Sequence, residues 1–366
     1  MAEQGKYTLK ENEAEARQRL RAFWTGESLG RPALCVRAKD PRYQPTDFDH
    51  PELTPKQKDH CPEWHAYLAR RELHEELYLA EAMPKARVRY GSGLTVVAAL
   101  AGGDYEYAES TGTSWTHPIE DIYDRPLPAY DPQHPVMQSL RASVNAVCDA
   151  AGSEGMVYPP NLLDGLTTLS NLRTSELLCL DVVERADDVK AWSKALTDIY
   201  IACYEDLYQL CVSRGYGETT SWLWAMAEGR MEAVQCDFAV MLSPAMFREF
   251  VMGDLGRVIE YTDYSLYHLD GTCQMRFLDQ LASLEGLGGI QWNPEPSAAS
   301  PALPKWIDAF RAIRDKGLSV YVSCTVEEGE QITRELGPDG LFLEFQPFET
   351  RDAAEEAIRR IERAVK

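Results

Sequence analysis

The chain has 366 residues, of which 45% are hydrophobic and 26% are charged, a balance typical of a globular protein with a sizeable core. Its 37 basic and 58 acidic side chains give a net charge of −21, which repels nucleic-acid phosphates and anionic lipids, so we expect neither nucleic acid nor a membrane as a partner. Without a signal-like or membrane-spanning apolar run, and with nine scattered cysteines that form no CxxC pair, the sequence predicts a cytoplasmic protein.

The first 80 residues contain signals for two helices and one strand. Residues 1–32 are predicted to form a helical extension, because apolar side chains recur at helical spacing from Lys10 to Trp24. A short strand is expected at Ala33–Ala38, and the proline-rich stretch 40–58 is expected to be a loop. A second amphipathic helix is predicted from Cys61 to Leu79.

Strand-like segments then recur, with helices between most of them. The eight predicted strands are Ala33–Ala38, Arg87–Tyr90, Gly155–Tyr158, Ala233–Phe238, Tyr264–Leu269, Gly288–Trp292, Leu318–Ser323 and Gly340–Phe345. Ser243 followed by Pro244 predicts a helix start, and Thr325 with Glu328 predicts a capping box.

The alternation of strands and helices favours a parallel sheet, and eight such units fit one (β/α)8 TIM barrel domain over residues 1–366. A doubly wound open sheet is the alternative, but its first strand is usually followed by a glycine-rich turn, where this chain has Lys39 and Asp40. Thr219–Ala227, which carries Trp222 and Trp224, is predicted to be an inserted aromatic arm that acts as a lid or as a subunit contact.

In a barrel of this kind, the residues at the carboxyl ends of the strands share one pocket. This rule selects Tyr90, Tyr158, Asp164, Asp237, His268, Asp270, Trp292, Asn293, Cys324, Glu344 and Gln346. Among them, we expect the substrate to contact Tyr90, Tyr158, Asp164, Trp292, Asn293 and Gln346.

His268 and Asp270 are the most informative pair, because they end a predicted strand two residues apart and so face the same way. An imidazole and a carboxylate placed like this can share a metal ion, or the carboxylate can orient the imidazole as a base. The alternative is structural, with Asp270 capping a turn and His268 hydrogen-bonded inside the barrel.

Two further carboxylates are candidates for the same site. Asp237 ends the strand before a capped helix and is predicted to be catalytic, a turn aspartate being the alternative. Glu344 lies within an apolar run, where an isolated carboxylate is costly to bury, so we expect it to ligate a metal or to pair with a core arginine.

Several segments together carry a family resemblance. The chain resembles the uroporphyrinogen decarboxylase-like superfamily in Leu242–Val251, Tyr267–Gly271, Gly289–Asn293 and Leu336–Phe342. One branch of that superfamily decarboxylates porphyrinogens without a cofactor, using an arginine-rich motif that is reduced here to Arg37. The other branch comprises cobalamin-dependent methyltransferases, which bind zinc through a His-x-Cys pair and a later cysteine.

The resemblance implies a methyltransferase-type enzyme that acts on a small molecule together with a corrinoid protein carrying cobalamin. His268 matches the histidine of the methyltransferase branch, while Asp270 and Glu344 stand in the regions of its two cysteines. Zinc bound by these three residues is therefore expected, with Asp237, His268 and Asp270 as the catalytic residues and a homodimer as the assembly.

Two alternatives remain open. One is a metal-independent lyase that decarboxylates a small acid or a porphyrinogen-like substrate without a cofactor, using pocket arginines such as Arg89 or Arg173. The other is a non-catalytic barrel that binds a tetrapyrrole or a corrinoid.

Overall fold

The structure is a computed structural model that describes residues 6–50, 52–108, 113–295, 297 and 300–365. Its α-helices are α1 (Glu13–Trp24), α2 (Pro55–Asp59), α3 (Pro62–His74), α4 (Val96–Leu100), α5 (Pro135–Ala151), α6 (Gly165–Arg173), α7 (Ser175–Glu184), α8 (Ala186–Ser213), α9 (Pro244–Phe250), α10 (Met252–Tyr261), α11 (Leu278–Leu281), α12 (Pro304–Asp315), α13 (Val326–Leu336) and α14 (Arg351–Val365). Four short 3₁₀ helices are η1 (Gly91–Gly93), η2 (Ile122–Asp124), η3 (Asp237–Met241) and η4 (Thr272–Phe277).

The strands form one large sheet and three pairs. They are β1 (Ala33–Lys39), β2 (Glu76–Ala80), β3 (Lys85–Arg87), β4 (Tyr105–Tyr107), β5 (Ser114–Thr116), β6 (Met156–Tyr158), β7 (Glu218–Thr219), β8 (Ala227–Glu228), β9 (Met231–Gln235), β10 (Tyr264–Asp270), β11 (Gly289–Asn293), β12 (Ser319–Ser323) and β13 (Leu341–Glu344). The large sheet has the strand order β2-β1-β13-β12-β11-β10-β9. Each pair of neighbouring strands in it is parallel, except that β2 is antiparallel to β1.

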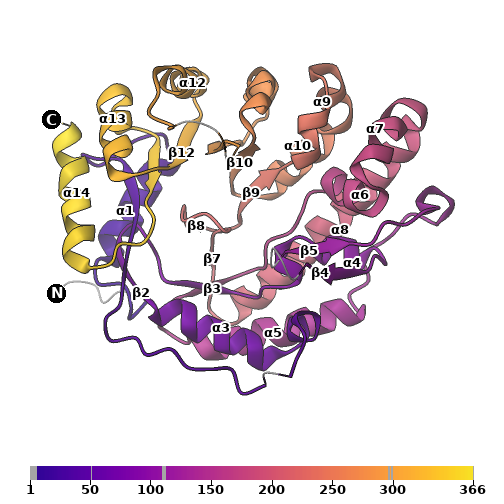
Figure 1. The fold of residues 1–366 in the computed structure, drawn as a ribbon, viewed down its shortest axis with the longest axis horizontal. Helices are drawn as coiled ribbons and strands as arrows, with labels where there is room; N and C mark the ends of the chain where they lie inside the picture. Colours follow the sequence, from indigo (N-terminus) through magenta and orange to yellow (C-terminus); the bar gives the residue numbers. More distant parts are fainter. Residues whose placement is uncertain (1–5, 51, 109–112, 296, 298–299, 366) are drawn as a thin grey trace.

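The fold is therefore mixed α/β with a central seven-stranded sheet, as the alternation of strands and helices predicted. All eight predicted strands are present, but β3 and β6 form a separate parallel pair. Figure 1 shows the helices on the outside of a curved row of strands, with α12, α13 and α14 along one arc and α3 and α5 on the opposite side.

Alternation along the strands decides which side chains face the helices. His268 lies in register with Gln235 and Gln291, whereas the next residue, Leu269, lies in register with Trp292. Trp292 packs against Trp306 and Phe310 of α12, so the side chains in register with Trp292 face the helical layer. Because side chains alternate along a strand, those in register with His268 face the inside of the curved sheet.

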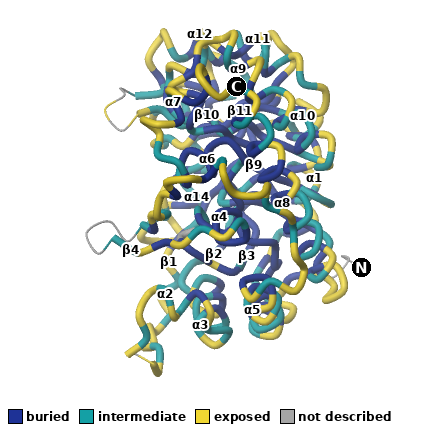
Figure 2. Tube along the Cα trace, turned by 90° about the vertical axis from the view of Figure 1, so that its right-hand side faces the viewer, coloured by how far each residue is buried: buried dark blue, intermediate teal, exposed yellow. Residues whose placement is uncertain are grey.

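The buried apolar side chains form one cluster that runs from Tyr7 to Ile361. Figure 2 shows the buried residues inside and the exposed residues mostly along the outer helices and loops. Close strand packing also selects glycine at residue 289, where an added Cβ would lie 2.4 Å from the carbonyl oxygen of Ser319 on β12. Within the described residues, no helix combines the length and the apolar character that crossing a membrane requires.

Several predicted boundaries were wrong, among them that of the strand expected at Ala233–Phe238, which is β9 and ends at Gln235. The helix expected over Cys61–Leu79 ends at His74, because the following residues pair with β1 as the edge strand β2. The strand expected at Arg87–Tyr90 begins earlier and ends at Arg87. The helix that starts at Ser243 is divided into α9 and α10 at Val251.

The predicted aromatic arm is present as the β7–β8 hairpin, and Figure 1 shows it in the middle of the surrounding elements. Lys85 holds its turn, because the buried ammonium group donates hydrogen bonds to the carbonyl oxygens of Ser221, Trp222 and Leu223. Burial lowers the pKa of Lys85. The arm thus lies inside the molecule, against the strand ends.

The base of the arm is tied to the N-terminal segment. The carboxylate of Glu218 on β7 accepts hydrogen bonds from Lys6 at 2.6 Å, from Tyr7 at 3.0 Å and from Arg17 at 2.6 Å. These charge-assisted contacts connect α1 and the residues before it to the arm.

Candidate functional site

The carboxyl end of β10 places His268 and Asp270 side by side, as their spacing predicted. His268 Nε2 lies 4.0 Å from Asp270 Oδ1, and Asp270 Oδ1 accepts a 2.8 Å hydrogen bond from Asn293 on β11. His268 Nδ1 hydrogen-bonds the amide oxygen of Gln291. Because an amide oxygen only accepts, Nδ1 carries a proton, and Nε2 is the ring nitrogen that lies toward Asp270.

Thr167 on α6 positions two more of the predicted carboxylates. Asp164 caps α6 by accepting a 2.9 Å hydrogen bond from the Thr167 amide, and the Thr167 hydroxyl oxygen accepts a 2.9 Å bond from the Asp237 amide. Gly165 lets α6 lie close to α8, since an added Cβ would be 2.4 Å from the carbonyl oxygen of Ser193. The ends of β9 and β10 and the start of α6 therefore meet at one place.

Burial and the charges of neighbouring groups shift the pKa values of Asp237 and Asp164. Burial raises the pKa of Asp237 to about 6, with the charge of His268 lowering it and that of Asp270 raising it. Burial and then the charge of Asp237 raise the pKa of Asp164 to about 7. We call Asp164, Asp237, His268 and Asp270 the carboxylate–histidine cluster.

The cluster also contains buried oxygens without a partner. Asp164 Oδ2 and Asp237 Oδ1 accept no hydrogen bond from the described part of the chain. A buried carboxylate oxygen left in this way is costly unless a proton or a ligand satisfies it. Together with the raised pKa values, this arrangement suits groups that exchange protons near neutral pH.

The zinc site expected from the resemblance does not fit this geometry. Glu344 stands on β13, separated from β10 by β11 and β12, and its Oε2 accepts hydrogen bonds from Tyr321 at 2.8 Å and Ser323 at 3.0 Å. Of the two roles predicted for Glu344, the geometry favours pairing with an arginine, since Arg37 Nη2 lies 3.9 Å from its Oε1. Among the described residues, no group of three or more His, Cys, Asp and Glu side chains is arranged to hold a metal ion.

The other predicted site residues are spread over several environments. Tyr158 lines a cavity described below, and Asn293 supports Asp270. Tyr90 is 1% exposed and packs against Tyr105, with ring centroids 5.7 Å apart. Trp292 faces the helical layer rather than the inside of the sheet, and Gln346 is exposed. Cys324 follows β12, and burial raises the pKa of its thiol.

Two cavities lie at the carboxyl ends of β3 and β6. The arm cavity, of about 170 Å³, is lined by Arg37, Glu72, Glu75, Glu76, Tyr78, Lys85, Arg87, Arg89, Tyr158, Trp222 and Trp224. The Trp64 cavity, of about 470 Å³, is lined by Pro55, Lys58, Asp59, Trp64, Leu68, Arg87, Val88, Arg89, Gly93, Tyr107 and Asn161. Arg87 and Arg89 line both cavities, which therefore adjoin.

The arm connects the arm cavity to the carboxylate–histidine cluster. The Trp222 ring meets the His268 ring edge-on, with centroids 5.4 Å apart and an angle of 86°. Trp224 contacts two basic side chains, with Lys85 Nζ 4.1 Å and the Arg37 guanidinium carbon 4.4 Å from its ring centroid. The arm thus forms a wall between the cluster and the cationic groups.

The sequence rule missed Lys85, Arg87, Asn161 and Gln291. Of the two arginines predicted for the decarboxylase alternative, Arg89 lines both cavities, whereas Arg173 lines neither and pairs with Asp181 at 2.8 Å. A signal was available, because cations at residues 85, 87 and 89 alternate with apolar residues and so share one face of an extended segment. Starting the predicted strand at Arg87 hid this pattern.

Comparisons with known proteins support the fold. A methyltransferase from Methanosarcina mazei has a similar structure, with a TM-score of 0.61 over 95% of this chain and 98% of that chain, at 15% sequence identity. No protein-family model matches the sequence. No curated protein matches it either.

Proposed function

We propose, from the fold that the chain shares with this methyltransferase, that the protein is a methyltransferase-type enzyme of the uroporphyrinogen decarboxylase-like superfamily. In this proposal the strands form a (β/α)8-type barrel, with the β3–β6 pair standing between the β2–β1 edge of the large sheet and β9. The lining of the arm cavity supports this arrangement, since it combines Arg37 of β1, Lys85 of β3 and Tyr158 of β6. The substrate is a small molecule that carries a methyl group on a heteroatom.

The observation that carries the proposal is the carboxylate–histidine cluster at the carboxyl ends of β9 and β10. When a methyl group leaves a heteroatom, its bond to carbon breaks and the electron pair stays on the heteroatom, which must then gain a proton. Asp237 is suited to supply it, because burial raises its pKa to about 6. His268 Nε2, which lies 4.0 Å from Asp270, is placed to take up a proton from solvent and pass it on to the cluster, while Gln291 keeps the other ring proton on Nδ1.

The methyl acceptor in this proposal is the corrinoid of a partner protein, and no step is assigned to zinc. The Asp164 carboxyl, whose pKa is raised to about 7, shares proton exchange with Asp237. Trp222 shields the His268 ring on one side, which limits the access of water to the reacting groups.

The test supplies free cob(I)alamin as the methyl acceptor to the purified protein. Methyl ethers, methylamines and methyl thioethers serve as donors, each as a carboxylate and as an uncharged analogue, and methylcobalamin formation is followed by absorbance. We expect transfer from at least one donor class and a loss of about 10²-fold or more in Asp237→Asn. Asp279→Asn is the control, because this aspartate is 86% exposed on the outer helix α11 and should retain full activity.

A second candidate is decarboxylation of a small acid, which the guanidinium group of Arg87 in the lining of the arm cavity favours. The same acids are therefore also assayed for carbon dioxide release. Release of carbon dioxide without any methyl transfer would replace the first proposal by the second, and the absence of both products would contradict both.

A further inference from the structure

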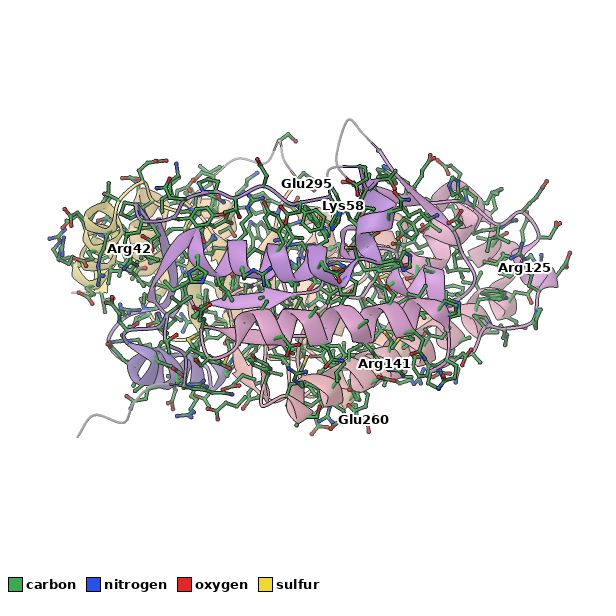
Figure 3. All side chains as sticks on the ribbon, turned by 90° about the horizontal axis from the view of Figure 1, so that it is seen from below. Arg42, Lys58, Arg125, Arg141, Glu260 and Glu295 are labelled. Atoms are coloured by element: carbon green, nitrogen blue, oxygen red, sulfur yellow. The ribbon has the colours of Figure 1, made fainter. Side chains whose placement is uncertain are left out.

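The Trp64 cavity is large enough to enclose an organic molecule and is built from several elements. Its volume of about 470 Å³ lies within the range of ligand pockets, about 300–1,000 Å³. Arg87 ends β3 and Asn161 follows the neighbouring parallel strand β6, while Trp64 and Leu68 come from α3. Figure 3 looks onto α3 from below and labels Lys58, which lies on the adjacent helix α2.

Two polar atoms in the lining of this cavity are buried without a hydrogen-bond partner in the described chain. They are Arg87 Nη1, a cationic donor, and Asn161 Oδ1, an acceptor. Leaving a buried polar atom unsatisfied costs about 1–3 kcal/mol, and more when the group is charged. Such atoms are expected where a ligand completes the hydrogen bonds.

The other charged groups of the lining already have partners. Arg89 pairs with Glu72 at 2.6 Å, and Lys58 lies 4.6 Å from the centroid of the Trp64 ring. The Asp59 carboxylate accepts hydrogen bonds from Tyr105 and Tyr107. Arg87, in contrast, makes no ion pair of 4.0 Å or less with any residue that the structure describes, and its guanidinium carbon lies 5.9 Å from the centroid of the Tyr158 ring.

We infer that the Trp64 cavity binds a small organic carboxylate, whose carboxylate group pairs with Arg87 and whose body lies against Trp64. This inference rests on the proposed function and names the substrate class of the same enzyme. The Asn161 amide hydrogen-bonds a neutral polar group of the ligand. The local cations offset the net charge of −21 that repels anions elsewhere on the protein.

A carboxylate fits better than a phosphate ester because only one guanidinium group is unpaired. A planar carboxylate matches the fork of one guanidinium group through two parallel hydrogen bonds. A phosphate dianion would bring a second charge, whereas Arg89 is already neutralised by Glu72 and the Lys58 ammonium group lies against the Trp64 ring.

The test measures ligand binding by titration calorimetry and needs no methyl acceptor. The probes are benzoate, its uncharged analogue benzamide, and phenyl phosphate. A ligand of this size is expected to have a Kd of about 1 mM. The wild-type protein should bind benzoate at least about tenfold more tightly than benzamide, since benzamide lacks the charge that pairs with Arg87.

Three variants isolate the role of Arg87. Arg87→Met should remove the preference for benzoate over benzamide, while Arg87→Lys should keep part of it and also shows that the cavity tolerates substitution. Arg71→Met is the matched control, because Arg71 lies on α3 with its side chain 50% exposed and should leave the preference unchanged. Thermal unfolding of each variant verifies that the fold is retained.

The outcomes separate this inference from the proposed function. Equal binding of benzoate and benzamide, a preference that survives Arg87→Met, tighter binding of phenyl phosphate, or no benzoate binding at about 10 mM would each overturn the carboxylate assignment. An Arg87-dependent preference without any methyl transfer would leave this inference standing and contradict only the proposed function. Methyl transfer from uncharged donors alone would support the proposed function and contradict the carboxylate assignment.

Discussion

At the scale of single residues, the most deeply buried ion pair of the described chain is held by paired hydrogen bonds. Arg31 and Glu81 are 4% and 0% exposed, and they form two parallel bonds of 2.6 and 3.0 Å. The Glu81 carboxylate also accepts a 2.7 Å bond from the Leu34 amide of β1. This buried pair fixes the start of β1, in contrast to Arg87, whose charge is left for a ligand.

We predict that Glu81→Gln destabilises the fold by about 3–5 kcal/mol, because it removes the buried carboxylate that binds Arg31 through two hydrogen bonds and leaves only the partly exposed Glu362, 3.6 Å from Arg31 Nε. The free energy of unfolding in urea measures this effect. Glu349→Gln is the control, since Glu349 pairs with Lys39 at the surface, where the side chains are 77% and 61% exposed, and it should cost less than about 1 kcal/mol. Equal effects of the two variants would show that the buried pair has no special role.

The positions of the candidate site residues could be predicted where strand ends alone decide them, and their roles stay predictions. Asp237, His268 and Asp270 lie together because neighbouring parallel strands bring their carboxyl ends to one edge. Glu344 also ends a strand but lies three strands from β10, and strand order within a sheet is not encoded in any local pattern. Trp292 was predicted to face the site but faces the helices. In a strand that is buried on both faces, the sequence does not tell which alternate side chains point toward the helices.

At the scale of elements, most strands with apolar runs were predictable, whereas strands whose formation depends on a distant partner were not. β10, β11, β12 and β13 were placed to within two residues at either end. β2 was predicted as the end of a helix, because its strand character depends on pairing with β1. The pairing of β3 with β6 brings Arg87 and Asn161 to one cavity, and such non-local contact has no sequence signature.

Strand β9 carries a buried carboxyl that couples folding to pH. Glu232 is 2% exposed, and burial raises its pKa to about 8. The folded state therefore holds this proton at pH values where the unfolded chain, with a pKa near the ordinary value of about 4.5, has lost it. The resulting stability is fully present below the unfolded pKa and is lost as the pH rises through about 8.

We predict that the free energy of unfolding falls on the order of 2–5 kcal/mol between pH 5 and pH 9 through this group. Glu232→Gln should remove most of that fall, because its amide does not ionise. Urea unfolding at both pH values measures the difference. Glu260→Gln, an exposed change on α10 labelled in Figure 3, should follow the wild-type pH dependence. An unchanged slope in Glu232→Gln would refute the assignment.

At the scale of the whole molecule, two opposing fields act on an anionic ligand. The net charge of −21 repels it over a distance set by salt, while the Arg87 guanidinium attracts it at contact. At 10 mM salt the screening length is about 30 Å, so the distant acidic groups act on the cavity, whereas at 150 mM it is about 8 Å.

We therefore predict that benzoate binds more tightly at 150 mM than at 10 mM sodium chloride, by about twofold to threefold, because salt screens the distant repulsion more than the contact with Arg87. Calorimetric titrations at the two salt concentrations measure this change. Benzamide is the control and should show no salt dependence. Weaker benzoate binding at the higher salt would mean that the local cations dominate the field at the cavity.

The ties between Glu218 and the N-terminal segment have a practical consequence for how the protein is produced and immobilised. Lys6, Tyr7 and Arg17 hold the base of the arm, and the turn of that arm forms a wall of the arm cavity. A fusion tag that displaces Lys6 would therefore disturb a structure some 200 residues away in sequence. A tag after α14, which ends on the outside of the molecule in Figure 1, avoids these contacts and suits surface attachment for binding assays.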